Sequence, residues 1–120
     1  MAGLTLIALT ACAAPGPPLD PASLTLHGRD QIFRFDYRID REPGRVEAVG
    51  LLNSSAPMFR FVRLRLVGVT ADGRVASQGF TTVDGTFGVP VRFSVNLRPT
   101  GAEASFELLV DGYALGFGGR

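Results

Sequence analysis

The stretch that decides the fold is residues 33–40, which read Phe33-Arg34-Phe35-Asp36-Tyr37-Arg38-Ile39-Asp40. Apolar and charged side chains alternate here without a break. A period of two with one apolar face is typical of a β-strand that packs one face against a core and turns the other to water. We therefore expect Phe35 to face the core and its neighbour Arg34 to face solvent.

The same alternation recurs along the chain and predicts further strands. Strong patterns lie at residues 62–66, 91–97 and 105–111, and weaker ones at 23–27, 46–52 and 75–80. The alternation at residues 62–66 changes phase at Val67 and Val69, which indicates a β-bulge or a segment covered on both faces. Phe93 and Phe106 are assigned to the same buried layer as Phe35.

Turn-forming pairs separate these segments. They are Pro43-Gly44, Asp72-Gly73, Asp84-Gly85 and Thr100-Gly101. Glycine in such pairs supplies the positive φ angle that tight reversals need. Since no stretch shows sustained helical periodicity, the sequence predicts an all-β domain over residues 23–120. Its expected form is an antiparallel sandwich of immunoglobulin or fibronectin type with six to seven short strands.

The N-terminus carries an export pattern. The apolar run at residues 4–9 is far shorter than the ~20 residues that a membrane-spanning helix needs. It leads into Leu9-Thr10-Ala11-Cys12, which resembles the bacterial lipobox. The resemblance implies that residues 1–11 are a signal peptide and that Cys12 carries a lipid in the bacterial cell envelope. The alternative is an apolar N-terminus in which Cys12 is an ordinary small hydrophobic residue.

Residues 12–22 form the expected tether between the lipid and the domain. Four prolines crowd this segment, at positions 15, 17, 18 and 21. They exclude helix and central strand and favour an extended polyproline geometry. Ala13, not Asp, follows the cysteine, which resembles the outer-membrane sorting pattern of Gram-negative lipoproteins. We expect the domain to face the periplasm from the outer membrane.

A second resemblance concerns the body of the chain. Residues 46–55, the strand at 61–69, the Asp72-Gly73 hairpin and residues 90–97 together resemble the FxLYD and late-embryogenesis-abundant type 2 group of small β-sandwiches. The chain departs from that pattern at Val69-Thr70, where the family carries Tyr-Asp. The resemblance implies a fold and carries no activity with it.

Composition and motifs favour a protein without catalytic chemistry. The chain has twelve arginines, no lysine and eleven acidic residues, for a formal charge of +1. That balance lacks the positive excess of a nucleic-acid binder. His27 is the only histidine and Cys12 the only cysteine, and no acidic pair shows metal-ligand spacing. The sequence predicts no catalytic residues, no metal site and no cofactor.

Three functional hypotheses remain open. The leading one is a lipid-anchored adaptor that binds another envelope protein through a sheet face or an unpaired edge strand. The possible interaction surface is a basic stripe of Arg60, Arg63 and Arg65 facing anionic lipid or a polymer, against the alternative of an ordinary charged exterior. The second is a binder of a small apolar ligand, held between the sheets or under the aromatic tail at residues 113–117. The third is an enzyme.

Overall fold

The computed structural model describes residues 19–55, 59–84 and 90–115. The predicted signal peptide, Cys12 and the reversal at Gly85 lie outside these ranges. The described residues form seven strands and one short 3-10 helix, η1. The elements are η1 (Pro21–Ser23), β1 (Leu26–Asp30), β2 (Phe33–Glu42), β3 (Arg45–Ser54), β4 (Phe59–Val69), β5 (Val75–Asp84), β6 (Val91–Leu97) and β7 (Ser105–Leu115).

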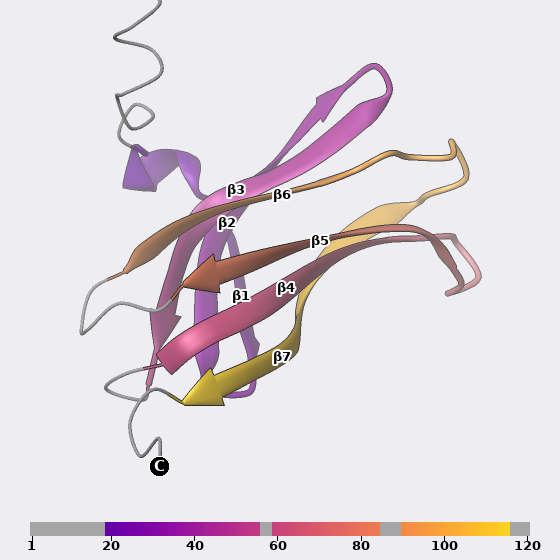
Figure 1. Cartoon of the computed structure of the whole chain (residues 1–120). Coiled ribbons are helices and arrows are strands. Elements are labelled where there is room, and N and C mark those ends of the chain that lie inside the picture. Colours follow the sequence, from indigo (N-terminus) through magenta and orange to yellow (C-terminus); the bar gives the residue numbers. More distant parts are fainter. Residues whose placement is uncertain (1–18, 56–58, 85–89, 116–120) are drawn as a thin grey trace, which may run out of the picture.

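The strands form two sheets that face each other (Figure 1). The four-stranded sheet has the order β1-β2-β3-β6, the three-stranded sheet has the order β5-β4-β7, and every paired neighbour is antiparallel. The predicted all-β sandwich of six to seven strands is confirmed. The four-plus-three division matches that of an immunoglobulin constant domain, whereas the connectivity differs because β1, β2 and β3 form a meander within one sheet.

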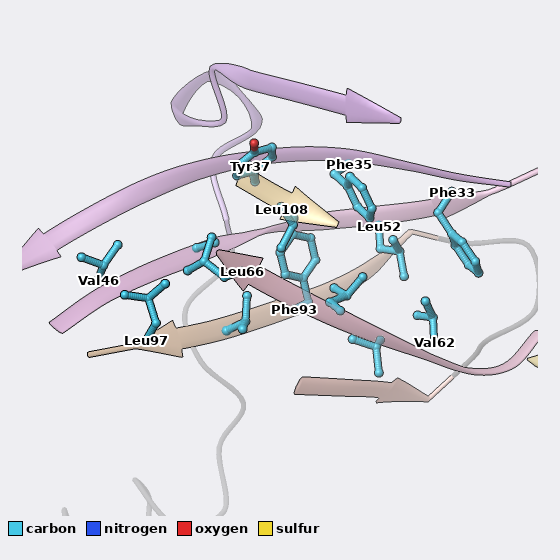
Figure 2. Close-up of a cluster of buried hydrophobic side chains, with 14 of the residues drawn as sticks. Phe33, Phe35, Tyr37, Val46, Leu52, Val62, Leu66, Phe93, Leu97 and Leu108 are labelled. Atoms are coloured by element: carbon cyan, nitrogen blue, oxygen red, sulfur yellow. The ribbon is translucent and has the colours of Figure 1, made fainter. Parts of the chain in front are cut away.

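The core lies between the sheets and is built from alternating side chains of both (Figure 2). In β2, Phe33, Phe35 and Tyr37 are buried while Arg34 is exposed, so the predicted register is confirmed. The ring of Phe35 packs edge-on against that of Phe93 on β6, with centroids 6.3 Å apart. The face of β2 that carries these apolar side chains therefore packs against the core.

Two details differ from the expected pattern. Residues 21–23 form η1, whose first turn is capped by the Asp20 carboxylate accepting from the backbone N–H of Ala22 at 3.0 Å, so the first strand begins only at Leu26. Phe106 is half-buried at the edge of the core, and the Arg41 guanidinium lies 4.9 Å from the centre of its ring. Phe106 therefore packs against the core as predicted, but the prediction that it belongs to the same buried layer as Phe35 is wrong as to its degree of burial.

The turns and the phase change of β4 follow the sequence pattern. Gly44, Gly73 and Gly101 have φ angles of 77°, 89° and 99°, which side-chain-bearing residues rarely adopt. The register of β4 against β5 shifts between Gly68 and Val69, where Gly68 pairs with Ser77 and Val69 with Val75, so the extra residue, Ala76, lies on β5. Val67 is buried although it points away from the core, which fits the other alternative, a segment covered on both faces. A further shift against β7, at Arg63, has no counterpart in the sequence pattern.

The two sheets also touch at both sides of the sandwich. On one side, β5 lies so close to β6 that a Cβ on Gly79 would stand 1.7 Å from the backbone oxygen of Asn96. On the other side, the backbone N–H of Val110 in β7 donates to the Asp30 carboxylate at the end of β1, at 2.9 Å. Both contacts bring edge strands of opposite sheets together.

Phe35 and Arg34 test the register with neighbouring residues. We expect Phe35→Ala to lower the free energy of unfolding by about 3–5 kcal/mol, because it removes a fully buried ring and leaves a cavity. Arg34→Ala should change it by less than about 0.5 kcal/mol, since that side chain is exposed. Denaturant unfolding of both variants is the measurement. A mild Phe35→Ala together with a severe Arg34→Ala would contradict the fold.

Candidate functional site

The predicted arginine stripe lies on the outer face of the three-stranded sheet. Arg63 and Arg65 sit on β4, and the Nε atom of each lies 3.6 Å from a carboxylate oxygen of Asp111 on β7. The strand pairing passes from Val110 to Gly112, so Asp111 is the extra residue of a β-bulge. Bulges re-aim side chains, and this one brings a single carboxylate between the two guanidinium groups.

Aromatic rings complete this surface. The Arg63 guanidinium lies 4.3 Å from the centre of the Phe80 ring, a cation–π contact. Arg65 Nη1 donates to the Gln78 side-chain oxygen at 3.4 Å. Phe80 and Phe61 remain 41% and 40% exposed. We call Phe61, Arg63, Arg65, Phe80 and Asp111 the arginine–aromatic patch.

Arg60 does not join the other two arginines. It is exposed at the irregularity in the β4–β7 pairing between Phe59 and Phe61, and within the described ranges it has no carboxylate partner. The structure therefore brings Arg63 and Arg65 together and leaves Arg60 beside them. A bare basic stripe was expected, and the surface is instead a mixed cluster with a carboxylate and aromatic rings.

A second arginine pair was missed in the sequence. Arg29 on β1 and Arg34 on β2 are direct cross-strand partners. They line a hollow of about 240 Å³ beside the β1–β2 turn. Placing the first strand at residues 23–27 hid this pairing, because Arg29 then fell in a loop. In the structure the chain reverses at Gln31, which has a φ angle of 59°, and this reversal brings Arg29 opposite Arg34.

Two hollows are described on the surface, and neither is lined by Tyr113, the aromatic residue of the tail that the structure describes. A second hollow, of about 340 Å³, is lined by Arg45, Arg98, Gln78 and Asn96 together with Gly44 and Leu97. Tyr113 instead packs edge-on against Phe33, with centroids 5.1 Å apart. Residues 116–120 lie outside the described ranges, so the small-ligand hypothesis stays a prediction without structural support.

His27 has an acidic partner and an exposed setting. Its Nδ1 lies 2.8 Å from Asp36 Oδ1 on the outer face of the four-stranded sheet, and its side chain is 66% exposed. No hydroxyl group of the described residues is bonded to it. A carboxylate and an imidazole can orient each other, but nucleophilic catalysis also needs the attacking group within reach of the base.

Glu103 has the most perturbed carboxyl group described, and its role is structural. The pKa is lowered from 4.5 to about 2, first by a hydrogen bond from the Ser77 hydroxyl and then by the backbone N–H groups of Thr100 and Gly101. These contacts measure 2.5, 2.8 and 2.9 Å. A Cβ on Gly68 would lie 2.5 Å from Glu103 Cγ, so the glycine makes room for the acid. The carboxylate ties the β6–β7 connection to β5.

Neither metal-binding clusters nor similarity to known proteins adds a function. Among the described residues, no group of three or more His, Cys, Asp or Glu side chains could hold a metal ion. The described elements also include no helix with the length and hydropathy that crossing a membrane requires. No family model, curated protein or solved structure matches the chain. The lipobox and FxLYD resemblances stay predictions.

Glu103 provides a pH test. A depressed pKa stabilises the fold above the unfolded value of about 4.5, and the contribution is lost as pH falls toward about 2. We expect Glu103→Gln to lower the thermal midpoint at pH 7, with the difference from the parent chain shrinking through this window. Melting curves from pH 7 to pH 2 measure it. A difference that is constant with pH would show that the carboxylate charge does not contribute.

Proposed function

We propose that the protein is a lipid-anchored, non-catalytic adaptor of the bacterial envelope. In this proposal Cys12 holds it at the outer membrane, and the outer face of its three-stranded sheet docks another envelope protein. The anchor is supported by the lipobox-like sequence. The docking role is supported by the arginine–aromatic patch, which is the observation that carries the proposal.

Residue types and exposure favour this patch as a binding surface. Arginine and aromatic residues are enriched among the residues that contribute most to protein–protein affinity. Two rings that are about 40% exposed on one sheet face offer apolar area that a partner can cover. The cation–π contact of Arg63 with Phe80 and the two ion pairs of Asp111 hold the arginines in place. Less side-chain freedom is then lost on binding.

The charges of the patch select the partner. Arg63 and Arg65 share one contacting carboxylate, that of Asp111, and Arg60 adds a third guanidinium group beside the patch. The centre of the outer face of the three-stranded sheet therefore carries more positive than negative charge, while Asp84 and Glu107 lie toward its two ends. We therefore assign as occupant a protein segment whose own carboxylates reach Arg60 and Arg63 beside apolar side chains that cover Phe61 and Phe80.

Site-specific cross-linking tests the docking face. A photoreactive amino acid in place of Thr82, which lies opposite Arg63 on the patch, should cross-link one envelope protein through an acidic peptide. The same probe at Ser94, on the outer face of the other sheet, should not. Adding Arg60→Glu and Phe80→Ser should reduce the cross-link at least tenfold, while Arg74→Glu, at an 82% exposed hairpin arginine, should leave it unchanged. Equal yields in all variants, or cross-links to copies of this chain alone, would overturn the proposal.

Lipidation is tested at Cys12 alone. We expect Cys12→Ser to abolish lipidation, to leave a longer unprocessed chain, and to release the domain from the membrane fraction. Mass spectrometry and fractionation of cells that express the full chain are the measurements. A variant whose mass and fractionation match those of the parent chain would remove the lipoprotein assignment, whatever the cross-linking shows.

A further inference from the structure

Two like charges stand side by side in the β1–β2 hairpin. Arg29 and Arg34 are direct cross-strand partners, and both point to the outer face of the four-stranded sheet. Like charges directly opposite in a sheet are destabilising. Five other arginines in the described ranges have a carboxylate within ion-pair distance, namely Arg38, Arg45, Arg63, Arg65 and Arg74. The hairpin pair therefore retains a like-charge repulsion that no carboxylate of the described residues within ion-pair distance offsets.

The carboxylates closest to this pair in sequence are bonded to other groups. Asp30, which follows Arg29, accepts a hydrogen bond from the backbone N–H of Val110 across the sandwich. Asp36, two residues beyond Arg34, is bonded to His27 at 2.8 Å. Within the described ranges neither Arg29 nor Arg34 has a hydrogen-bonding or ion-pair partner. Both guanidinium groups can thus donate to a ligand.

The two arginines line a hollow. It measures about 240 Å³, and its other walls include Gln31, Asn53, Ser54 and Phe33. The side-chain amides of Gln31 and Asn53 add donors beside the guanidinium groups. Phe33 is fixed by edge-on contacts with Phe59 and Tyr113 at 5.2 and 5.1 Å. The wall at Ser55 is held by its N–H donating to the Ile32 oxygen at 2.8 Å. The hollow is polar, positively charged and built on strand ends.

The chemistry of the hollow selects an oxyanion. Guanidinium groups bind carboxylate and phosphate oxygens through paired N–H donors. Two adjacent guanidinium groups without a protein carboxylate balance a dianion better than a single charge, and a phosphate monoester carries about −1.5 to −2 charges at pH 7. Since pockets for drug-sized ligands begin at about 300 Å³, this one suits a compact head group. We propose that Arg29 and Arg34 form a binding site for a phosphate monoester group.

The position of the site separates it from the proposed docking surface. β1 runs from Leu26, next to η1, to Asp30 at the turn, so the hollow lies at the end of the sandwich away from η1 (Figure 1). The arginine–aromatic patch lies on the other sheet. Phosphate binding and partner docking can therefore succeed or fail independently.

Titration calorimetry of the full chain with inorganic phosphate and with glycerol phosphate tests the site. At constant ionic strength we expect saturable binding of both, and Arg29→Gln or Arg34→Gln should each weaken it at least about tenfold. Arg74→Gln is the matched control and should bind as the parent chain does. Either hairpin variant should also unfold at an equal or higher temperature, because it removes the like-charge repulsion.

Binding to lipid vesicles shows whether the phosphate group belongs to a lipid head group or to a free phosphorylated molecule. Tighter binding to phosphatidic acid vesicles than to glycerol phosphate, with none to phosphatidylcholine, would assign a lipid head group. Binding to glycerol phosphate alone would assign a free phosphorylated molecule. The proposed site would be wrong if neither glycerol phosphate nor phosphatidic acid vesicles bound. It would also be wrong if the Arg29→Gln/Arg34→Gln double variant bound them as tightly as the parent chain does. Acetate that binds as tightly as phosphate would overturn the assignment of a dianion.

Discussion

The whole structure depends on one apolar layer between the two sheets. A single cysteine forms no internal disulfide, and no tryptophan is present, so Phe, Leu and Val side chains must hold the sandwich together. Burial contributes about 25 cal/mol per Å² of apolar surface, and Phe35, Leu52 and Leu64 have almost none of theirs exposed. Because every second residue of the inner strands is committed to this layer, charged side chains can gather only on the two outer faces. Both arginine clusters lie there.

The fold was predictable wherever a strand has one buried and one solvated face. β2 and β6 show that alternation in full, and glycine marks the turns at positions 44, 73 and 101. β1 was misplaced because it is an edge strand whose five residues bury no side chain completely, so its sequence carries little periodic signal. Phe106 was misjudged because an apolar residue near the start of a strand can lie at the rim of the core as easily as at its centre.

For the candidate sites, the sequence could predict only which side chains of a single strand share a face. Two residues apart on β4, Arg63 and Arg65 had to share a face. That Asp111 would stand between them depends on a bulge in β7 and on the pairing of strands far apart in sequence. Arg29 and Arg34 were likewise invisible as a pair, because their contact depends on the register of the first hairpin. Local patterns specify orientation, whereas neighbours across strands are set by tertiary structure.

The strand order also bears on how the chain assembles. β1, β2 and β3 pair as successive hairpins, as do β4 and β5, whereas β3–β6 and β4–β7 join distant segments, with Val46 opposite Leu97. Closing a loop costs more entropy as it lengthens, and such non-local pairings slow folding. The three-strand meander and the β4–β5 hairpin can therefore close at low entropic cost. β6 and β7 each need a preformed edge on which to add, which makes the C-terminal third of the chain the kinetically demanding part of this small domain.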